Sequence, residues 1–213
     1  MSLYHLVREP KQKLDKNPAL VLLHGYGSNE EDLFTFASEL PEKYYIISVR
    51  APHSLQPYGY AWYSLYFDKG ENKFSDNEQA IASRDEVVKF IDSLPKQYAI
   101  DENDITLLGF SQGSILSYAV ALSYPEKVKR VVAMSGYMNT DIVAADYKVK
   151  DFSNLRMFVS HGTVDQTVPV AWARKAPPIL KALNIDHEYK EYPVGHGVAP
   201  QNFYDVLKWL EQN

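Results

Sequence analysis

The chain of 213 residues contains no cysteine. This absence excludes disulfide bonds, zinc–thiolate sites and a cysteine nucleophile. The sequence also lacks an apolar run of membrane-spanning length and a basic-then-apolar signal segment at its N-terminus. A net charge of −5, with lysines and arginines scattered along the chain, argues against a nucleic-acid-binding surface. We therefore expect a cytoplasmic protein without a membrane span, although a missing cysteine is also compatible with export followed by removal of a leader.

Apolar residues make up 46 % of the chain and charged residues 23 %, which is ordinary for a globular protein. No internal repeat, low-complexity tract or linker divides the sequence. Apolar strand-like runs alternate with helix-like runs, a pattern typical of a mostly parallel sheet covered by helices on both faces. The expected strands are 4–8, 19–23, 44–49, 105–108, 131–134, 157–160 and 186–192. The sequence therefore predicts one doubly wound α/β domain over residues 1–213.

Two expected helices begin at capping patterns, Ser28 with Glu31 and Ser75 with Glu78. The first of these helices has an apolar face that extends to Leu40, and the second ends at Pro95. Further helices are expected over 112–123, 169–183 (interrupted by a pair of prolines at 177–178) and 203–210.

The pentapeptide Gly109-Phe110-Ser111-Gln112-Gly113 lies where the expected strand 105–108 meets the expected helix 112–123. This is the form of a serine nucleophile elbow, in which a sharp turn exposes the hydroxyl near the first amides of a helix. A β-carbon two residues before or after the serine would crowd such a turn, so glycine is expected at both positions. The motif predicts that Ser111 is a nucleophile.

A serine hydroxyl becomes reactive when an imidazole takes its proton and a carboxylate orients that imidazole. These partners should follow strands, in the order serine, acid, histidine. His196 fits best, because it comes after the last expected strand and is framed by two glycines. The other histidines are expected to have structural roles or to come too early in the chain: His5, His24, His53, His161 and His187.

Asp165 is the best candidate for the acid, since it follows the expected strand 157–160 by a few residues. It has an alternative role as the side chain of an Asx-type turn before Val168-Pro169. The other aspartates considered are explained more simply as loop charges or as turn and capping residues ahead of the serine: Asp141, Asp146, Asp151, Asp101 and Asp104.

An oxyanion hole requires two backbone donors. The amide of Gln112 is one candidate, because it comes directly after the nucleophile at a helix N-terminus. The other is the amide of Tyr26, since the glycines of His24-Gly25-Tyr26-Gly27 let this loop fold back toward the serine.

Four motifs in this order resemble the phospholipase/carboxylesterase family of α/β-hydrolases, which includes small bacterial carboxylesterases and acyl-protein thioesterases. They are residues 22–27, the elbow 109–113, residues 161–169 and Gly195-His196-Gly197; Ala61-Trp62-Tyr63 and residues 134–137 also match. The resemblance covers essentially the whole chain. It implies Ser111, Asp165 and His196 as a catalytic triad, Tyr26 and Gln112 as oxyanion donors, no cofactor or metal, a minimal lid and often a homodimer.

Two departures from the family pattern concern substrate preference. Ser114 stands where the family often has a second glycine, and Tyr26 with Gly27-Ser28 stands where it often has Leu followed by Gly-Asp. Neither departure touches the triad. The acyl-chain preference of relatives therefore does not transfer directly to this chain.

Aromatic residues are concentrated between residues 50 and 74. These rings either cover the hydrophobic core beneath a long loop or form a pocket wall that contacts the substrate. For the second role we expect Trp62 and Tyr63, because these two match the family pattern.

The sequence thus predicts a serine carboxylesterase that acts on small or short-chain acyl esters through an acyl-enzyme. A thioesterase or lysophospholipase using the same chemistry is an alternative, as are a peptidase and a non-catalytic binding protein on a hydrolase fold. The expected partner is a small-molecule ester.

Overall fold

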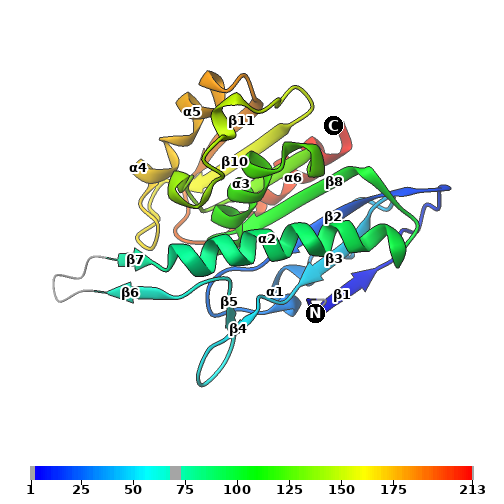
Figure 1. The fold of residues 1–213 in the computed structure, drawn as a ribbon, viewed down its shortest axis with the longest axis horizontal. Helices are drawn as coiled ribbons and strands as arrows, with labels where there is room; N and C mark the ends of the chain where they lie inside the picture. The colour runs from blue at the N-terminus through cyan, green and yellow to red at the C-terminus, as the bar shows by residue number, and fades with distance from the viewer. Residues whose placement is uncertain (1–2, 68–72, 213) are drawn as a thin grey trace.

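A computed structural model describes residues 3–67 and 73–212, and its central feature is a seven-stranded sheet (Figure 1). The strand order is β1-β3-β2-β8-β9-β10-β11, in which β1 is an antiparallel edge strand and every other pair is parallel. The strands of this sheet are β1 His5–Arg8, β2 Asn17–Leu23, β3 Tyr45–Val49, β8 Ile100–Phe110, β9 Arg130–Met134, β10 Arg156–Gly162 and β11 Asp186–Tyr192. The helices are α1 Glu30–Phe34, α2 Asn77–Ser93, α3 Gln112–Ser123, α4 Val170–Ala173, α5 Ala176–Ala182 and α6 Pro200–Gln212.

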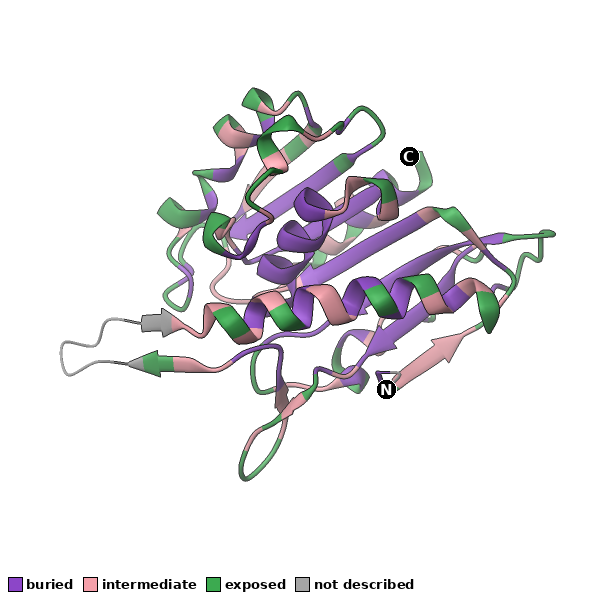
Figure 2. Ribbon diagram, viewed as in Figure 1, coloured by how far each residue is buried: buried purple, intermediate pink, exposed green. Residues whose placement is uncertain are grey.

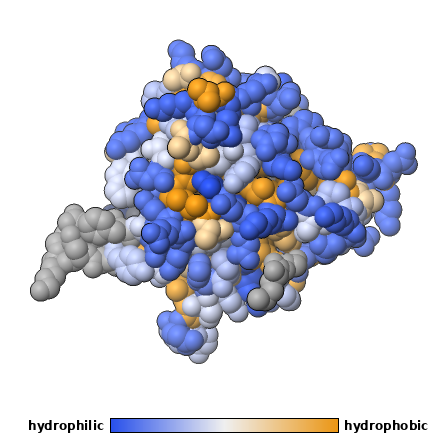
Figure 3. All heavy atoms as spheres, in the orientation of Figure 1, coloured by the Kyte–Doolittle hydropathy of each residue, from blue (hydrophilic) through white to orange (hydrophobic). Residues whose placement is uncertain are grey.

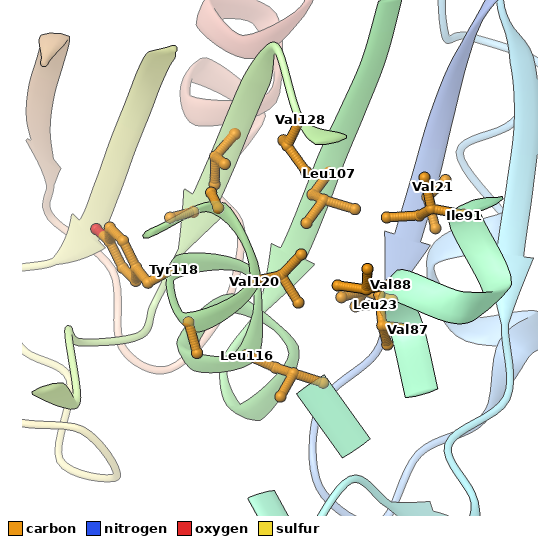
Figure 4. Close-up of a cluster of buried hydrophobic side chains, with 14 of the residues drawn as sticks. Val21, Leu23, Val87, Val88, Ile91, Leu107, Leu116, Tyr118, Val120 and Val128 are labelled. Atoms are coloured by element: carbon orange, nitrogen blue, oxygen red, sulfur yellow. The ribbon is translucent and has the colours of Figure 1, made fainter. Parts of the chain in front are cut away.

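Alternating residues of the central strands enter two separate hydrophobic clusters, one on each face of the sheet. In β2, Val21 and Leu23 pack beneath α2 and α3, as Figure 4 shows, whereas Leu20 and Leu22 face α1 and α6. Because both faces are covered, β2 and β3 are buried along their whole length (Figure 2). This arrangement explains why these strands are continuous apolar runs, and it confirms the predicted single α/β domain.

Both predicted caps are displaced by one residue. Asn29, not Ser28, caps α1 by accepting the Glu31 amide at 2.8 Å, and Asp76, not Ser75, caps α2 by accepting the Gln79 amide. The side-chain oxygen of Asn or Asp reaches the amide two or three residues later, as a cap requires.

The first helix is also shorter than predicted, since α1 ends at Phe34. Beyond it the chain continues through turns, and the Thr35 hydroxyl donates to the Asp32 carbonyl at 2.7 Å. Ala37 and Leu40 are buried all the same. The apolar spacing therefore marks a buried face correctly but overestimates the helix.

The prolines at 177–178 act as predicted, because they fall in the first turn of α5 and separate it from α4. The strand before the elbow is longer than predicted, with β8 beginning at Ile100 instead of Ile105. Its register against β2 shifts between Asn17 and Ala19, where the pairing is irregular.

The aromatic stretch 50–74 is not the loop without secondary structure that the sequence suggests. It forms two short antiparallel ribbons, β4 His53–Ser54 with β5 Tyr60–Ala61, and β6 Leu65–Phe67 with β7 Lys73–Ser75. Residues 68–72 of the stretch lie outside the described part of the chain. Both ribbons, together with α4, lie at the end of the sheet where the parallel strands terminate (Figure 1).

Within the described residues, no helix has the length and apolar character needed to cross a membrane. On the face shown in Figure 3, hydrophobic residues form small patches separated by hydrophilic ones.

Candidate active site

Ser111 lies at a sharp turn between β8 and α3, with φ at +53° and ψ at −115°. This backbone region is sparsely populated for residues other than glycine, and such strain is characteristic of functional turns. The Ser111 amide donates to the Met134 carbonyl of β9 at 2.9 Å, which secures the turn to the sheet.

The two elbow glycines are required for different steric reasons. A β-carbon on Gly109 would lie 2.4 Å from the Gly113 carbonyl oxygen, so it would crowd the turn itself. A β-carbon on Gly113 would lie 2.0 Å from the Leu23 carbonyl oxygen of β2. Gly113 therefore permits α3 to begin directly against the neighbouring strand, a contact that the motif alone does not reveal.

The structure brings Ser111, His196 and Asp165 together from three loops. His196 Nε2 lies 2.9 Å from Ser111 Oγ, and His196 Nδ1 lies 2.7 Å from Asp165 Oδ2. With a carboxylate beside Nδ1, that nitrogen carries the proton and leaves Nε2 as the acceptor for the serine hydroxyl. The side chain of His196 is 20 % exposed, whereas that of Asp165 is completely buried.

Asp165 is held firmly by backbone donors. Its Oδ1 accepts the amides of Thr167 and Val168, each at 2.9 Å. These bonds form the Asx-type turn that the sequence offers as the alternative role, so one carboxylate orders its own loop and also contacts His196. His161 Nε2 donates to the Val168 carbonyl at 2.8 Å and lies 3.3 Å from Asp165 Oδ2. A buried carboxylate bound by several donors is fixed in orientation.

The loop after β2, residues His24–Ser28, passes directly over the elbow. A β-carbon on Gly25 would lie 3.4 Å from Ser111 Cβ, which shows how closely the two segments pack. Among the described residues, the amide of Tyr26 has no hydrogen-bond acceptor. Gln112 is the first residue of α3, a position whose amide has no acceptor within the helix.

The side chain of Gln112 performs a structural task that the sequence does not predict. Its Oε1 accepts the Trp62 amide at 2.9 Å, and its Nε2 donates to the Tyr63 carbonyl at 2.8 Å. The Trp62 indole donates to the His24 carbonyl at 2.9 Å. These bonds join the elbow, the His24–Ser28 loop and the segment after β5.

The side chains of Trp62 and Tyr63 are 0 % and 1 % exposed, and both belong to the core on the α2 side of the sheet. Burial raises the pKa of Tyr63 far above its ordinary value. Rings without exposed surface do not fit the expected pocket wall, and they match the alternative that they roof the core.

The remaining histidines and aspartates occupy other parts of the fold. His24 is fully buried, its Nδ1 donates to the Gly25 carbonyl at 2.8 Å, and its Nε2 accepts the Ala51 amide at 3.1 Å. Burial lowers the pKa of His24, so the ring stays neutral as this pair of bonds requires. His5 and His187 lie in strands, and His53 lies in β4. Three of the aspartates are exposed: Asp141, Asp146 and Asp151.

The structure contains a pocket with aromatic residues near the site that the sequence does not predict. The loop after β9 and helix α4 line an open hollow of about 400 Å³, in which the rings of Tyr137 and Trp172 pack edge to face with centroids 5.2 Å apart. Both walls adjoin triad segments: a β-carbon on Gly136 would lie 3.0 Å from the Ser111 carbonyl, and Trp172 follows the Asp165 turn. Trp172 is 37 % exposed. Tyr137 ends the family-like motif 134–137, but Trp172 belongs to no motif, so the sequence does not bring together one residue of the loop after β9 and one of α4.

In the described part of the chain, no group of three or more histidine, aspartate or glutamate side chains is arranged to hold a metal ion.

Comparisons with known proteins identify the family and the fold of the chain. An acyl-protein thioesterase 1 from Mycosarcoma maydis is 25 % identical over 97 % of this chain and 95 % of its own length. An acyl-protein thioesterase 1 from Yarrowia lipolytica is 26 % identical over 99 % of this chain and 97 % of its own length. Among solved structures, esterase PE8 aligns with a TM-score of 0.85 at 24 % identity over 100 % of this chain and 99 % of its own. The Bacillus cereus carboxylesterase aligns with a TM-score of 0.85 at 21 % identity, over 99 % of this chain and 94 % of its own. The model of the phospholipase/carboxylesterase family matches residues 4–213, and the chain therefore belongs to that family of α/β-hydrolases.

Proposed function

We propose that this protein is a serine carboxylesterase that cleaves small or short-chain acyl esters through Ser111, His196 and Asp165. The observation that carries the proposal is the continuous chain of hydrogen bonds from Ser111 Oγ to His196 to the buried carboxylate of Asp165, at 2.9 and 2.7 Å. Family membership supports the same reaction class.

In the first half of the reaction, neutral His196 removes the Ser111 proton as Oγ attacks the ester carbonyl. Asp165 stabilises the imidazolium that forms, without becoming protonated. The amides of Tyr26 and Gln112 donate to the oxyanion, helped at Gln112 by the positive end of the α3 dipole. His196 then returns the proton to the departing alcohol and leaves an acyl-Ser111 ester. In the second half, water repeats the cycle, with His196 again as the base.

We assign the organic group of the substrate to the open pocket lined by Tyr137 and Trp172. Its partly exposed aromatic rings offer apolar surface, as ligand sites usually do, on segments that adjoin the elbow and the Asp165 turn. The minimal cover over this end of the sheet favours small acyl groups. A thioesterase is the second candidate, because the curated relatives named above are acyl-protein thioesterases.

Covalent labelling and a substrate panel test the proposal together. We expect a fluorophosphonate probe to label the protein and the modified peptide to contain Ser111. A series of 4-nitrophenyl esters of increasing acyl length, assayed beside a matched thioester, then ranks esterase against thioesterase. A protein that hydrolyses none of these compounds and resists the probe is a binding protein on a hydrolase fold, and the proposal is wrong.

Trp172→Ala tests the assigned pocket. Removing this ring deletes roughly 1–2 kcal/mol of apolar contact with the substrate, which corresponds to about a tenfold increase in KM for the preferred ester. The fold should be unaffected because the side chain is partly exposed. The measurement is the steady-state KM and kcat across the ester series.

The control for this variant is Tyr204→Ala, which removes another exposed ring from the surface of α6. An equal KM for Trp172→Ala, Tyr204→Ala and the wild type would show that the substrate binds elsewhere.

The homodimer implied by the family and the cytoplasmic location expected from the missing cysteine stay predictions, to be checked by light scattering and by fractionation of cells.

A further inference from the structure

The His24–Ser28 loop has to be held in place by its surroundings, because two of its five residues are glycines and Tyr26 is 43 % exposed. One support is the β4–β5 ribbon. The Gly27 amide donates to the Tyr60 carbonyl at 2.9 Å, and the Tyr60 amide donates to the Ser28 carbonyl at 2.8 Å. A β-carbon on Gly59 would lie 2.0 Å from the Gly27 carbonyl oxygen, so the ribbon rests directly on the loop.

A second support begins two residues beyond the loop, at Glu30. The carboxylate of Glu30, at the start of α1, has a side chain only 4 % exposed. Arg50 binds both of its oxygens, with Nε donating to Oε2 at 2.7 Å and Nη2 donating to Oε1. Hydrogen bonding to Arg50 lowers the pKa of Glu30 against the opposing effect of burial, so the pair is charged.

The guanidinium of Arg50 also lies between two aromatic rings. Its central carbon is 4.2 Å from the centroid of Tyr4 and 4.7 Å from that of Tyr60. A planar cation between aromatic faces is a stacking arrangement that Arg makes and Lys does not reproduce. The next residue, Ala51, donates its amide to His24 Nε2 at 3.1 Å. Arg50 and its neighbour therefore contact groups on both sides of the loop.

We propose that Arg50 is a positioning residue that holds the His24–Ser28 loop so that the Tyr26 amide points at the developing oxyanion, by joining Glu30 at one end of the loop to Tyr60 alongside it. Arg50 does not touch the substrate. The inference rests on the proposed function, since it concerns the oxyanion donor of that same reaction.

This role has a kinetic signature that differs from simple stabilisation. An oxyanion donor acts on the transition state, so a misplaced donor lowers kcat and leaves ground-state binding unchanged. A displacement of about 1 Å costs up to roughly 100-fold in rate. We therefore expect Arg50→Lys to lower kcat by about 10- to 100-fold with KM within roughly threefold of wild type.

The experiment compares Arg50→Lys, Arg50→Met and the double variant Arg50→Met/Glu30→Gln. Each is assayed for kcat and KM on a short 4-nitrophenyl ester, for inhibition by an alkyl boronic acid that forms a tetrahedral adduct on serine, and for its melting temperature. The expected result is that the boronate inhibition constant rises in parallel with the loss of kcat/KM. The double variant should recover stability, because Gln leaves no unpaired charge, but should not recover kcat.

Arg130→Lys is the matched control. Arg130 is a buried arginine that pairs with Asp104 at the other end of the sheet, so its replacement tests loss of stability without disturbance of the loop. We expect Arg130→Lys to lower the melting temperature and to leave kcat unchanged.

Three outcomes overturn the inference. One is an Arg50→Lys enzyme with wild-type kcat, and another is a loss of kcat without a change in boronate affinity. If Arg50→Met does not fold, Arg50→Lys decides. The third is a wild-type protein that neither hydrolyses esters nor reacts with a fluorophosphonate, because the proposed function then fails and the inference fails with it. An active wild type with unaffected Arg50 variants refutes the inference alone.

Discussion

Ser111→Ala is expected to lower kcat/KM for ester hydrolysis by roughly 10⁴-fold or more and to abolish labelling by a fluorophosphonate. Without the hydroxyl no acyl-enzyme forms, and His196 can only activate water at a position that was arranged for Oγ. The fold should remain, because Ala has a β-carbon like Ser and adopts the same backbone conformation at φ +53°. The measurements are steady-state kinetics, intact-protein mass after probe treatment and the melting temperature.

His196→Ala and the double variant Ser111→Ala/His196→Ala complete this test. Residues that act as one unit have strongly non-additive effects, so the double variant should be little worse than either single variant. Independent, multiplying losses would indicate that Ser111 and His196 do not work together, despite the 2.9 Å between Oγ and Nε2.

Gly113→Ala is expected to destabilise the fold by about 3 kcal/mol or more, and to lower the melting temperature by roughly 6–12 °C. The added β-carbon would lie 2.0 Å from the Leu23 carbonyl oxygen and 2.7 Å from that of His24. Both obstacles are backbone atoms, so no side-chain rotation relieves the clash and α3 has to move away from β2. Because the start of α3 carries the Gln112 amide, the activity of the folded fraction should fall as well. Thermal denaturation followed by circular dichroism measures the first effect, and kinetics normalised to probe-reactive protein measure the second.

Gly195→Ala provides the matched control for this glycine. A β-carbon at Gly195 meets no atom within 4 Å, although the residue stands next to His196. Its replacement should shift the melting temperature by less than about 2 °C, within the usual range for surface changes. If Gly195→Ala and Gly113→Ala destabilise equally, the close approach of α3 to β2 is not what requires glycine at position 113.

The sequence predicted the sheet well and the details of its connections less well. Continuous apolar runs located the strands of the central sheet, because buried parallel strands have a strong composition signal. The helix starts were less certain, because Asn29 and Asp76 each stand next to a serine that could also cap the helix. Only the hydrogen bonds that the two side chains accept from the amides of Glu31 and Gln79 show which residue is the cap. The aromatic stretch was misjudged because two- and three-residue strands have too few positions for a periodic pattern to show.

The candidate site, like the fold, could be predicted from the sequence only in part. The proximity of Ser111, Asp165 and His196 was predictable because all three follow strands whose ends meet at one edge of the sheet, so chain order constrains them. Trp62 and Tyr63 were expected in the pocket, yet the structure buries both and uses their backbone to hold Gln112. The aromatic pair that lines an open pocket is instead the partly buried Tyr137 with the exposed Trp172.

What the sequence by itself determined is the α/β architecture and the placing of Ser111, Asp165 and His196 after strands that end at one edge of the sheet, because apolar strand runs and short glycine-framed motifs are local properties of the chain. Only the tertiary structure decided that Trp62 and Tyr63 are buried and which side chains surround the His24–Ser28 loop. Arg50, Glu30 and Tyr60 have no motif between them, and they meet because β3, α1 and the β4–β5 ribbon converge around one loop. Side-chain packing between segments distant in the chain depends on three-dimensional distances, which local patterns do not encode.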